Sequence, residues 1–227
     1  IAQKLYEAGH ITYMRTDSTN LGAQAVAQIA SVVEQKFGQN YFEPHKFSKK
    51  SKNAQEAHEA IRPTHLNIEN AGATDEQQRL YRLIWQRTVA SQMKSAEVMR
   101  TKIVANINNL EVEPPSKMPD FWLNGSRILF DGWLKADPAS ASEDVILPRF
   151  TVNDQLKLIK IDSMEKQTEP PTRYSEAGLI KELEKRGIGR PSTYASIIKT
   201  LNDRGYVEKI AKALHPTDIG EVVSTFI

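Results

Sequence analysis

The sequence has no cysteine among its 227 residues. Disulfide bonds and thiolate metal sites are therefore excluded within it, and the absence fits an intracellular protein. Long apolar runs are missing as well, since no stretch approaches the roughly 18 apolar residues that a membrane-spanning helix needs. The first residues also lack the apolar segment of a secretory signal. With 40% apolar and 26% charged residues, the composition is typical of a soluble globular protein.

An excess of one charge is also lacking, because the formal net charge is only +2. Such a small value does not by itself indicate a polyanionic partner. Two segments are locally basic: "HKFSKKSK", with four lysines and no acidic residue, and the stretch from Lys181 to Lys212. Runs of this kind are usually solvated faces, and each is also a candidate phosphate contact.

The N-terminal half has the apolar spacing of helices. "IAQKLYEAG" has helical spacing up to Gly9, so we expect this sequence to begin inside an element and to belong to a longer protein. The spacing predicts a helix over 20–38, with N-cap candidates in the Asp-Ser-Thr-Asn cluster at 17–20, and a second helix over about 75–93. Residues 1–98 are therefore expected to be mainly helical.

The pattern changes after residue 98. "TKIVANINNLEV", "FWLNGSRILFDGWLK" and "DVILPRFTVNDQLKLIKIDSM" favour β-branched and aromatic residues between turn formers, which predicts an antiparallel β region over 99–167. After the stiff segment "TEPPTRY", residues 168–227 predict two short helices around a glycine-containing turn and then a β wing, a winged-helix-like arrangement. The predicted fold class is α+β, with three domains over 1–98, 99–167 and 168–227.

The segment "HITYMRTDSTNL" places Tyr13 two residues before Arg15. A tyrosine phenol has a pKa near 10, so it needs help to attack phosphorus at neutral pH. A nearby guanidinium would stabilise the phenolate and hold phosphate oxygens, and on an extended segment both side chains would project to the same side. The alternative interpretation is an ordinary strand tyrosine, an exposed arginine and a helix cap.

The segment "EAHEAIRPT" contains His58 and Arg62, which helical spacing would put on one face. The pair could grip a phosphate, with His58 donating a hydrogen bond or a proton. A metal site is less favoured, because no other histidine or aspartate completes a ligand set. A structural histidine on a mixed acidic and basic surface is the alternative.

The segment "KRGIGRPSTYAS" gathers Arg190, Ser192 and Thr193 around glycines at the start of a helix. Backbone amides, hydroxyls and a cation in one turn are suited to binding phosphate. The segment is not a Walker loop, because the Gly-Lys-Ser/Thr ending is missing. A helix–helix turn capped by Ser192 is the alternative. Arg204, in "DRGYV", could contact a nucleic-acid backbone in the same way.

Taken together, these motifs resemble a known family. "ITYMRTDSTNL", "QEAHEAIRPT", "DGW", "YSEAGLIKELEKRGIGRPSTYASIIKTLNDRGYV" and "LHPTDIGEVV" are similar to segments of bacterial DNA topoisomerase I, a family of type IA topoisomerases, and they occur in the family's order. The resemblance implies that Tyr13 attacks single-stranded DNA to form a 5′-phosphotyrosine without ATP, with Arg15 and His58 beside it. It also implies that Arg62, Arg190, Ser192, Thr193 and Arg204 border the DNA.

The same resemblance implies parts that this sequence does not contain. The family's acidic, Mg²⁺-binding Toprim domain and its cysteine-ligated zinc modules are absent, so no metal site and no cofactor are expected here. We expect the isolated chain to be inactive in relaxing supercoils. The resemblance further implies a monomer of the bacterial cytoplasm and nucleoid that acts on single-stranded and negatively supercoiled DNA and not on membranes.

Three alternatives stay open from the sequence. The chain could be a non-catalytic module that binds single-stranded nucleic acid through its basic loop and winged-helix-like end. It could be a scaffold whose basic residues are merely solvated. Within the enzyme class, it could belong to topoisomerase III or reverse gyrase, although the long C-terminal motif favours topoisomerase I.

Overall fold

A computed structural model describes residues 1–47, 58–106 and 120–227. The chain divides into two compact units. The first contains Ile1–Met14 and, from Ser18 onward, the described residues up to Asp162; the second contains Arg15–Asp17 and Ser163–Ile227. Helices and small antiparallel sheets together make this an α+β protein, which confirms the predicted class at that level. None of the described helices is both long and apolar enough to span a membrane.

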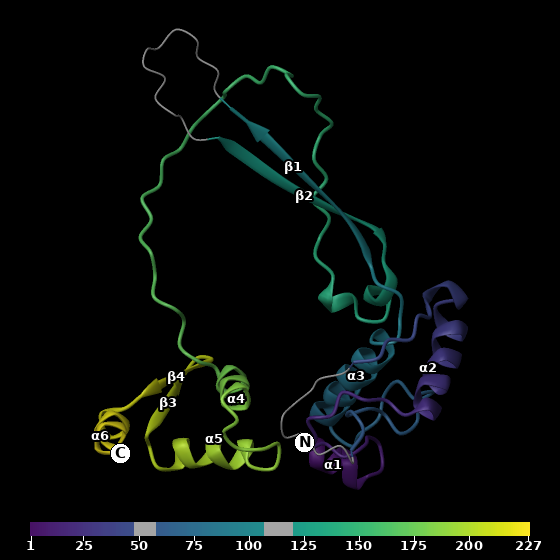
Figure 1. The fold of residues 1–227 in the computed structure, drawn as a ribbon, viewed down its shortest axis with the longest axis vertical. Coiled ribbons are helices and arrows are strands. Elements are labelled where there is room, and N and C mark those ends of the chain that lie inside the picture. Colours follow the sequence, from purple (N-terminus) through teal and green to yellow (C-terminus); the bar gives the residue numbers. More distant parts are fainter. Residues whose placement is uncertain (48–57, 107–119) are drawn as a thin grey trace. The chain divides into compact units, whose positions relative to one another are not determined.

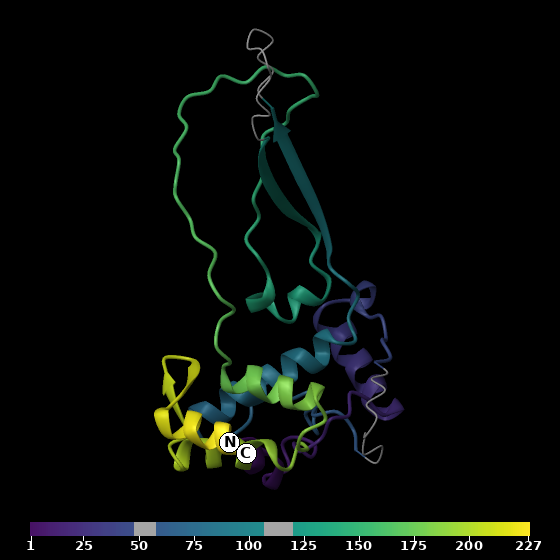
Figure 2. The ribbon, with the colours of Figure 1, turned by 60° about the vertical axis from the view of Figure 1, so that its left-hand side comes forward.

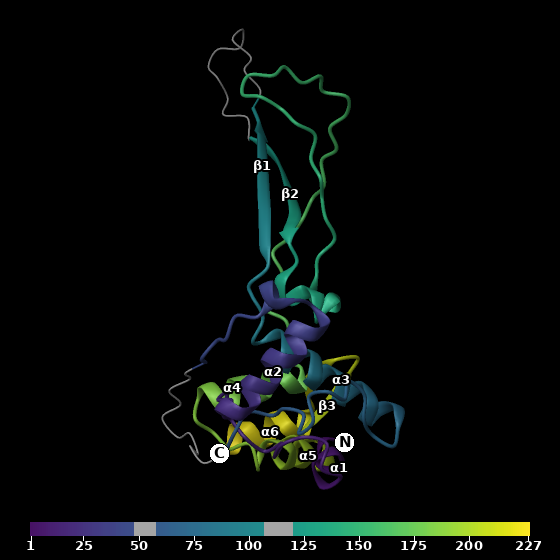
Figure 3. The same cartoon turned by 90° about the vertical axis from the view of Figure 1, so that its right-hand side faces the viewer.

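The first unit begins with its helices, α1 (Ala2–Glu7), α2 (Ala23–Lys36) and α3 (Asp75–Ala90), and a 3₁₀ turn, η1 (Gln39–Tyr41). The apolar side of α2 is buried at positions spaced by three and four residues, and the chain leaves it through Gly38, whose φ of 105° suits glycine. Thr74 caps α3 by accepting a hydrogen bond from the Gln77 amide over 3.3 Å. Figure 3 shows α2 beside α3.

One apolar core joins these helices to the loop after residue 62. Tyr81 and Trp85 of α3 are 1% and 4% exposed. The Tyr81 hydroxyl donates to the Ile68 carbonyl over 2.8 Å, and Trp85 Nε1 donates to the Leu66 carbonyl over 2.8 Å. Burial raises the pKa of Tyr81, so its hydroxyl stays a donor. Side chains of α3 therefore hold the loop through hydrogen bonds to its backbone carbonyls. The buried members of the core are Leu5, Ile11, Ile29, Val32, Val33, Leu66, Tyr81, Trp85, Val89, Ala90, Met93 and Ala136.

A two-stranded antiparallel ribbon follows, made of β1 (Glu97–Ala105) and β2 (Phe121–Phe130) (Figure 1). Thr101 pairs with Gly125 near its middle. The prediction of a larger β region is wrong for the segment after it. Val145 makes an isolated bridge to Ser126, and residues 146–174 contain neither helix nor strand (Figure 2). Residues 107–112 of "TKIVANINNLEV" lie outside the described part.

The base of the ribbon is tied to the helices through Tyr41. Its hydroxyl donates to Asp131 Oδ1 over 2.8 Å, and its ring lies 5.0 Å from that of Phe130, centroid to centroid. Lys135 Nζ lies 4.5 Å from the Tyr41 ring centroid, within range of a cation–π contact. Asp131 immediately precedes the 3₁₀ turn η2 (Gly132–Lys135), which is followed by η3 (Pro138–Ser140). The ribbon and the helices consequently pack as one unit.

The second unit contains α4 (Glu176–Lys185), α5 (Tyr194–Asp203), the hairpin of β3 (Val207–Ile210) and β4 (Ala213–Pro216), and α6 (Asp218–Phe226). Ser175 and Thr217 cap α4 and α6, because their hydroxyls accept from the amides of Gly178 and Gly220. β3 and β4 are antiparallel. The two helices, the turn and the hairpin occur in the order that the sequence predicted.

Candidate active site around Tyr13

The chain on either side of Tyr13 differs in how it is held. On the N-terminal side, Ile11 forms an antiparallel bridge with Pro63 and is 1% exposed. The Thr12 amide donates to the Arg62 carbonyl over 2.9 Å, and the Thr64 amide donates to the His10 carbonyl over 3.0 Å. Tyr13 is thus the first residue past a short stretch of strand-like pairing, where its side chain is half-buried.

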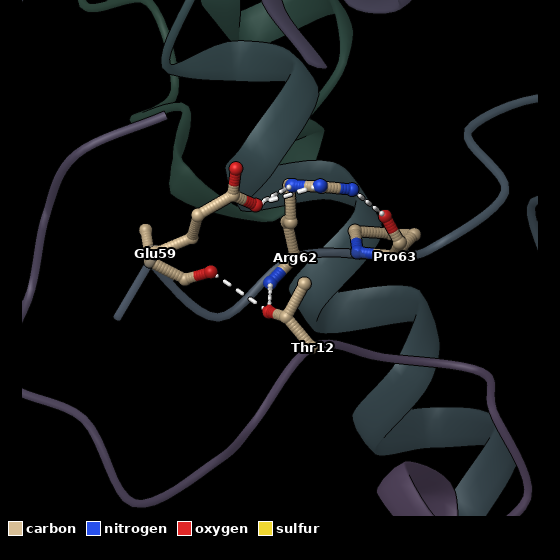
Figure 4. Close-up of polar contacts among 5 residues, drawn as sticks. Thr12, Glu59, Arg62 and Pro63 are labelled. Atoms are coloured by element: carbon tan, nitrogen blue, oxygen red, sulfur yellow. Dashed lines mark hydrogen bonds and ion pairs between the residues drawn. The ribbon is translucent and has the colours of Figure 1, made fainter. Parts of the chain in front are cut away.

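Thr12 adds side-chain hydrogen bonds to this pairing (Figure 4). Its hydroxyl donates to the Ala60 carbonyl over 2.8 Å and accepts from the Arg62 amide over 2.9 Å. The residue immediately before Tyr13 is therefore fixed to the loop that carries His58. The sequence did not single out Thr12, because a threonine hydroxyl has no signature that reveals a partner some fifty residues away.

The ring of Tyr13 contacts two other aromatic rings. The Tyr6 ring is 5.3 Å away, centroid to centroid, at an interplanar angle of 73°. The His58 ring is 5.2 Å away at 34°. Both separations fall in the range of favourable aromatic pairs. The structure thus brings the predicted pair Tyr13 and His58 together, and it adds Tyr6, which sequence reasoning missed.

His58 has a buried ring nitrogen without a hydrogen bond. Its Nδ1 has no partner among the residues that the structure describes. Buried polar atoms in folded proteins are nearly always paired, and each exception needs an explanation. A histidine with a free nitrogen beside a tyrosine can offer one hydrogen bond to a bound group.

The predicted helical alignment of His58 and Arg62 is wrong, because residues 58–62 form no helix. The residue before a proline is disfavoured in the α conformation, and Pro63 follows Arg62 directly. The Arg62 side chain is 17% exposed and pairs with Glu59: its Nε lies 2.8 Å and its Nη2 2.6 Å from Glu59 Oε2 (Figure 4). Its Nη1 also donates to the Pro63 carbonyl over 3.0 Å. In this structure the Arg62 guanidinium therefore stabilises its own loop, through an ion pair with Glu59 and a hydrogen bond to Pro63.

The segment after Tyr13 also differs from the prediction. The chain bends at Met14 and Arg15, so the alternation of an extended strand does not apply to Tyr13 and Arg15. Arg15 is exposed and groups with the second unit. The N-cap prediction is wrong as well, since Gly22 precedes the first turn of α2 and no side chain caps it.

The polar residues at 17–20 make other contacts. Ser18 Oγ accepts from the Asn20 amide over 3.2 Å, and the Thr19 hydroxyl donates to the Phe47 carbonyl over 3.1 Å. The first bond is local and the second reaches a residue beyond η1, and neither of them caps α2.

In the second unit, the turn before α5 brings Arg190, Ser192 and Thr193 together, all of them exposed. Gly189 has a φ of 78°, which lets the turn close. The Arg190 amide donates to Thr193 Oγ1 over 2.8 Å. Thr193, and not Ser192, is the N-cap residue of α5.

Arg204 is the C-cap residue of the same helix. With a rise of about 1.5 Å per residue, α5 separates Arg204 from the turn by about 15 Å. Arg204 therefore does not belong to the same cluster, and both ends of α5 present an exposed arginine.

No group of three or more histidine, aspartate or glutamate side chains that could hold a metal ion occurs within 1–47, 58–106 and 120–227. Mg²⁺ favours oxygen ligands, usually one or two carboxylates with waters and phosphate oxygens. Within the described ranges the carboxylates and histidines do not gather into a metal site made of protein ligands alone.

A family model described as DNA topoisomerase matches residues 1–227. The chain belongs to the type IA DNA topoisomerases. It is similar to DNA topoisomerase 1 of Pseudomonas aeruginosa, with 43% identity over 99% of this chain and 26% of that protein. It is also similar to DNA topoisomerase 1 of Aquifex aeolicus, with 42% identity over 100% of this chain and 41% of that protein.

A solved structure of full-length topoisomerase I from Thermotoga maritima has the same fold, with a TM-score of 0.80 and 36% identity. The match covers 96% of this chain and 34% of that one. The topoisomerase chain described here thus spans less than half the length of each of these relatives.

Proposed function

We propose that this chain is the part of a type IA DNA topoisomerase that supplies the nucleophile, Tyr13. The parent enzyme would relax negatively supercoiled DNA by cutting one strand, passing another through the break and resealing it without ATP. Membership of the family over the whole chain is the observation that carries the proposal. The ring contacts and the fixed backbone of Tyr13 support it, because nucleophilic displacement depends on positioning.

The chemistry follows from the phenol. Tyr13 Oη attacks the phosphorus of a phosphodiester, the bond from phosphorus to the 3′ oxygen breaks, and the tyrosine becomes linked to the 5′ phosphate. The phenol loses its proton and the departing 3′ oxygen gains one. Since one phosphate ester replaces another, the 3′ hydroxyl can reverse the step, which explains why ATP is not needed. Little further covalent work is asked of the protein.

We assign charge stabilisation to Arg15 and His58. A guanidinium binds two phosphate oxygens at once and stays charged at any working pH. The unpartnered Nδ1 of His58 suits a hydrogen bond to a phosphate oxygen near Tyr13. Removing one such donor lowers the rate by roughly 10²–10³-fold in comparable sites.

We place the DNA backbone contacts on Arg190, Ser192, Thr193 and Arg204. All four are exposed at the ends of α5, and an arginine at each end suits a strand that follows the helix. Arg62 is proposed to join them by exchanging Glu59 for a phosphate, since a carboxylate and a phosphate compete for the same guanidinium. The acidic, Mg²⁺-binding part of the site would come from elsewhere in the parent enzyme, which works as a monomer in the bacterial cytoplasm.

We further propose three functional segments. Residues 1–98 would be the mobile domain that carries Tyr13, residues 99–167 part of an arch, and residues 168–227 a winged-helix-like part of the groove for single-stranded DNA. The ribbon of β1 and β2 supports the arch, and the α4–α5–hairpin order supports the winged-helix comparison.

The test uses Tyr13→Phe in the full-length parent enzyme. A single-stranded oligonucleotide labelled at its 3′ end is incubated with enzyme and Mg²⁺, and covalent adducts are trapped with denaturant. We expect the variant to lose adducts and relaxation completely while it keeps its affinity for single strands. Tyr174→Phe, at an exposed tyrosine, is the matched control and should behave as wild type. Adducts that persist in Tyr13→Phe would overturn the proposal.

The same preparation separates the proposal from a simple binding module. Under the module hypothesis, wild-type enzyme forms no adduct and Tyr13→Phe changes nothing. We also expect the 227-residue chain alone to leave negatively supercoiled plasmid unrelaxed in the presence of Mg²⁺. Relaxation by that chain would show that the division of the active site proposed here is wrong.

A further inference from the structure

We infer that Tyr6 is a positioning residue for the nucleophile, through its ring and not through its hydroxyl. The inference rests on the proposed role of Tyr13. The Tyr6 ring contacts the Tyr13 ring at 5.3 Å and 73°, an edge-to-face arrangement. The Tyr13 ring also contacts that of His58 at 5.2 Å. The proposed nucleophile thus contacts two aromatic rings from different segments of the chain.

The segment that carries Tyr6 is firmly anchored. Leu5, its neighbour in α1, is 0% exposed and belongs to the core. The His10 amide donates to the Leu5 carbonyl over 2.9 Å, and the Gly9 amide donates to the Tyr6 carbonyl over 2.9 Å. These bonds close the end of α1 just before the chain enters the Ile11 bridge. Tyr6 therefore projects its ring toward Tyr13 from a fixed base.

The second ring is carried by a loop whose backbone is held at Ala60 and Arg62. His58 belongs to the loop that Thr12 ties down through the Ala60 carbonyl and the Arg62 amide. Each ring limits the rotation of the Tyr13 side chain from one side. A nucleophile must approach phosphorus in line with the leaving group, so restricting its unproductive rotamers raises the rate of attack.

The hydroxyl of Tyr6 makes no hydrogen bond to Tyr13. It has no hydrogen-bond partner among the described residues, and the residue is 41% exposed. A hydroxyl without a partner can be removed without leaving another polar group unpaired. Phenylalanine should therefore serve as well as tyrosine at this position, whereas a residue without a ring should not.

The experiment compares Tyr6→Leu with Tyr6→Phe in the full-length parent enzyme. Single-turnover cleavage of a 3′-labelled oligonucleotide at saturating enzyme gives the cleavage rate, and titration with Tyr13→Phe as background gives the Kd. We expect Tyr6→Leu to cleave about 3- to 10-fold more slowly, the range that corresponds to the loss of one aromatic pair. Its Kd for the oligonucleotide should be unchanged, and Tyr6→Phe should cleave at the wild-type rate.

Tyr6 could instead stack on a DNA base, and the same measurements distinguish stacking from positioning of Tyr13. A stacking platform would raise the Kd of Tyr6→Leu while the saturated cleavage rate stays at the wild-type value. That result would overturn the inference, as would a Tyr6→Phe variant as slow as Tyr6→Leu, or a Tyr6→Leu variant as fast as wild type. Phe121→Leu, in β2 and with the same 41% exposure as Tyr6, controls for loss of an exposed aromatic ring.

Folding and identity are checked separately. Thermal unfolding of the 227-residue chain, followed by the fluorescence of its three tryptophans, reports whether Tyr6→Leu still packs; one of them, Trp85, is 4% exposed in the core that also contains Leu5 of α1. If it melts earlier than wild type, Tyr6→Met, which keeps more side-chain length, takes its place in the same comparison. Covalent adducts that persist in the Tyr13→Phe variant would refute the proposed function itself, whatever the Tyr6 variants do.

Discussion

Replacing Thr12 by valine would remove one hydroxyl beside Tyr13 and keep the shape of the side chain. That hydroxyl donates to the Ala60 carbonyl over 2.8 Å and accepts from the Arg62 amide over 2.9 Å. Its loss leaves the amide without this acceptor and the carbonyl without this donor, in half-buried surroundings. Leaving such groups unpaired costs about 1–3 kcal/mol. We therefore expect Thr12→Val to lower the free energy of unfolding of the first unit by about 2 kcal/mol.

Urea unfolding followed by tryptophan fluorescence measures this loss. All three tryptophans, Trp85, Trp122 and Trp133, belong to the first unit, so the signal reports that unit alone. With a slope of about 2 kcal/mol per M urea, a loss of about 2 kcal/mol moves the midpoint down by about 1 M. The slope itself should not change, because the variant buries the same surface.

Thr101→Val is the matched control. Thr101 lies in β1, is exposed, and its hydroxyl has no partner in the described part of the chain. Exposed substitutions of this kind stay within about 0.5 kcal/mol, or about 0.25 M in midpoint. Equal midpoints for the two variants would refute the reasoning that the Thr12 hydroxyl fastens the Tyr13 segment to the His58 loop.

Three further predictions concern stability. Tyr81→Phe removes the donor to two loop carbonyls and should lower the free energy of unfolding by about 1–3 kcal/mol in the same assay, whereas Tyr6→Phe, at an exposed tyrosine of the same unit, should change it little. Gly132→Ala should lose about 3 kcal/mol or more, because φ is +49° and the new Cβ would lie 2.5 Å from a backbone oxygen; Gly9→Ala, with positive φ but open space, should lose only about 1–2 kcal/mol. Gly220→Ala would put Cβ 2.1 Å from a carbonyl oxygen and should make α6 sensitive to limited proteolysis, a result that unchanged cleavage would contradict.

The long helices could be read from the sequence because their own residues determine them. The apolar spacing that predicted a helix over 75–93 is the spacing that buries Tyr81, Trp85 and Val89 in α3. The end of the helix differs from the prediction, since α3 stops at Ala90 and Met93 is buried outside the helix. Helix ends depend on caps and on tertiary contacts, which spacing does not encode.

The loop that carries His58 could not be read in this way. Four-residue spacing of His58 and Arg62 is compatible with a helix, but in the structure the Arg62 amide and carbonyl both pair with Thr12. That pairing joins residues about fifty positions apart, so no local pattern reveals it. Pro63 was the one local signal against a helix, because it disfavours the α conformation at the residue before it.

The prediction of β structure after Val145 is wrong for a related reason. Alternating apolar residues over 146–161 resemble a strand, yet Ile146, Val152 and Ile159 are strongly exposed. A strand needs a neighbour to satisfy its backbone groups, and the described residues offer this segment none beyond the single bridge at Val145. The residue types of this segment therefore match a strand, but without a partner strand the segment forms no sheet.

The positions of Tyr6, Tyr13 and His58 support the proposed catalytic role of Tyr13 more directly than residue types do. A histidine kept only for packing would be expected to pair its buried ring nitrogen, because an unpaired buried donor or acceptor costs about 1–3 kcal/mol. Nδ1 of His58 has no such partner among the described residues, yet its ring is held against Tyr13. The two rings in contact with Tyr13, and the His58 nitrogen without a described partner, agree with the proposed attack of Tyr13 on phosphorus.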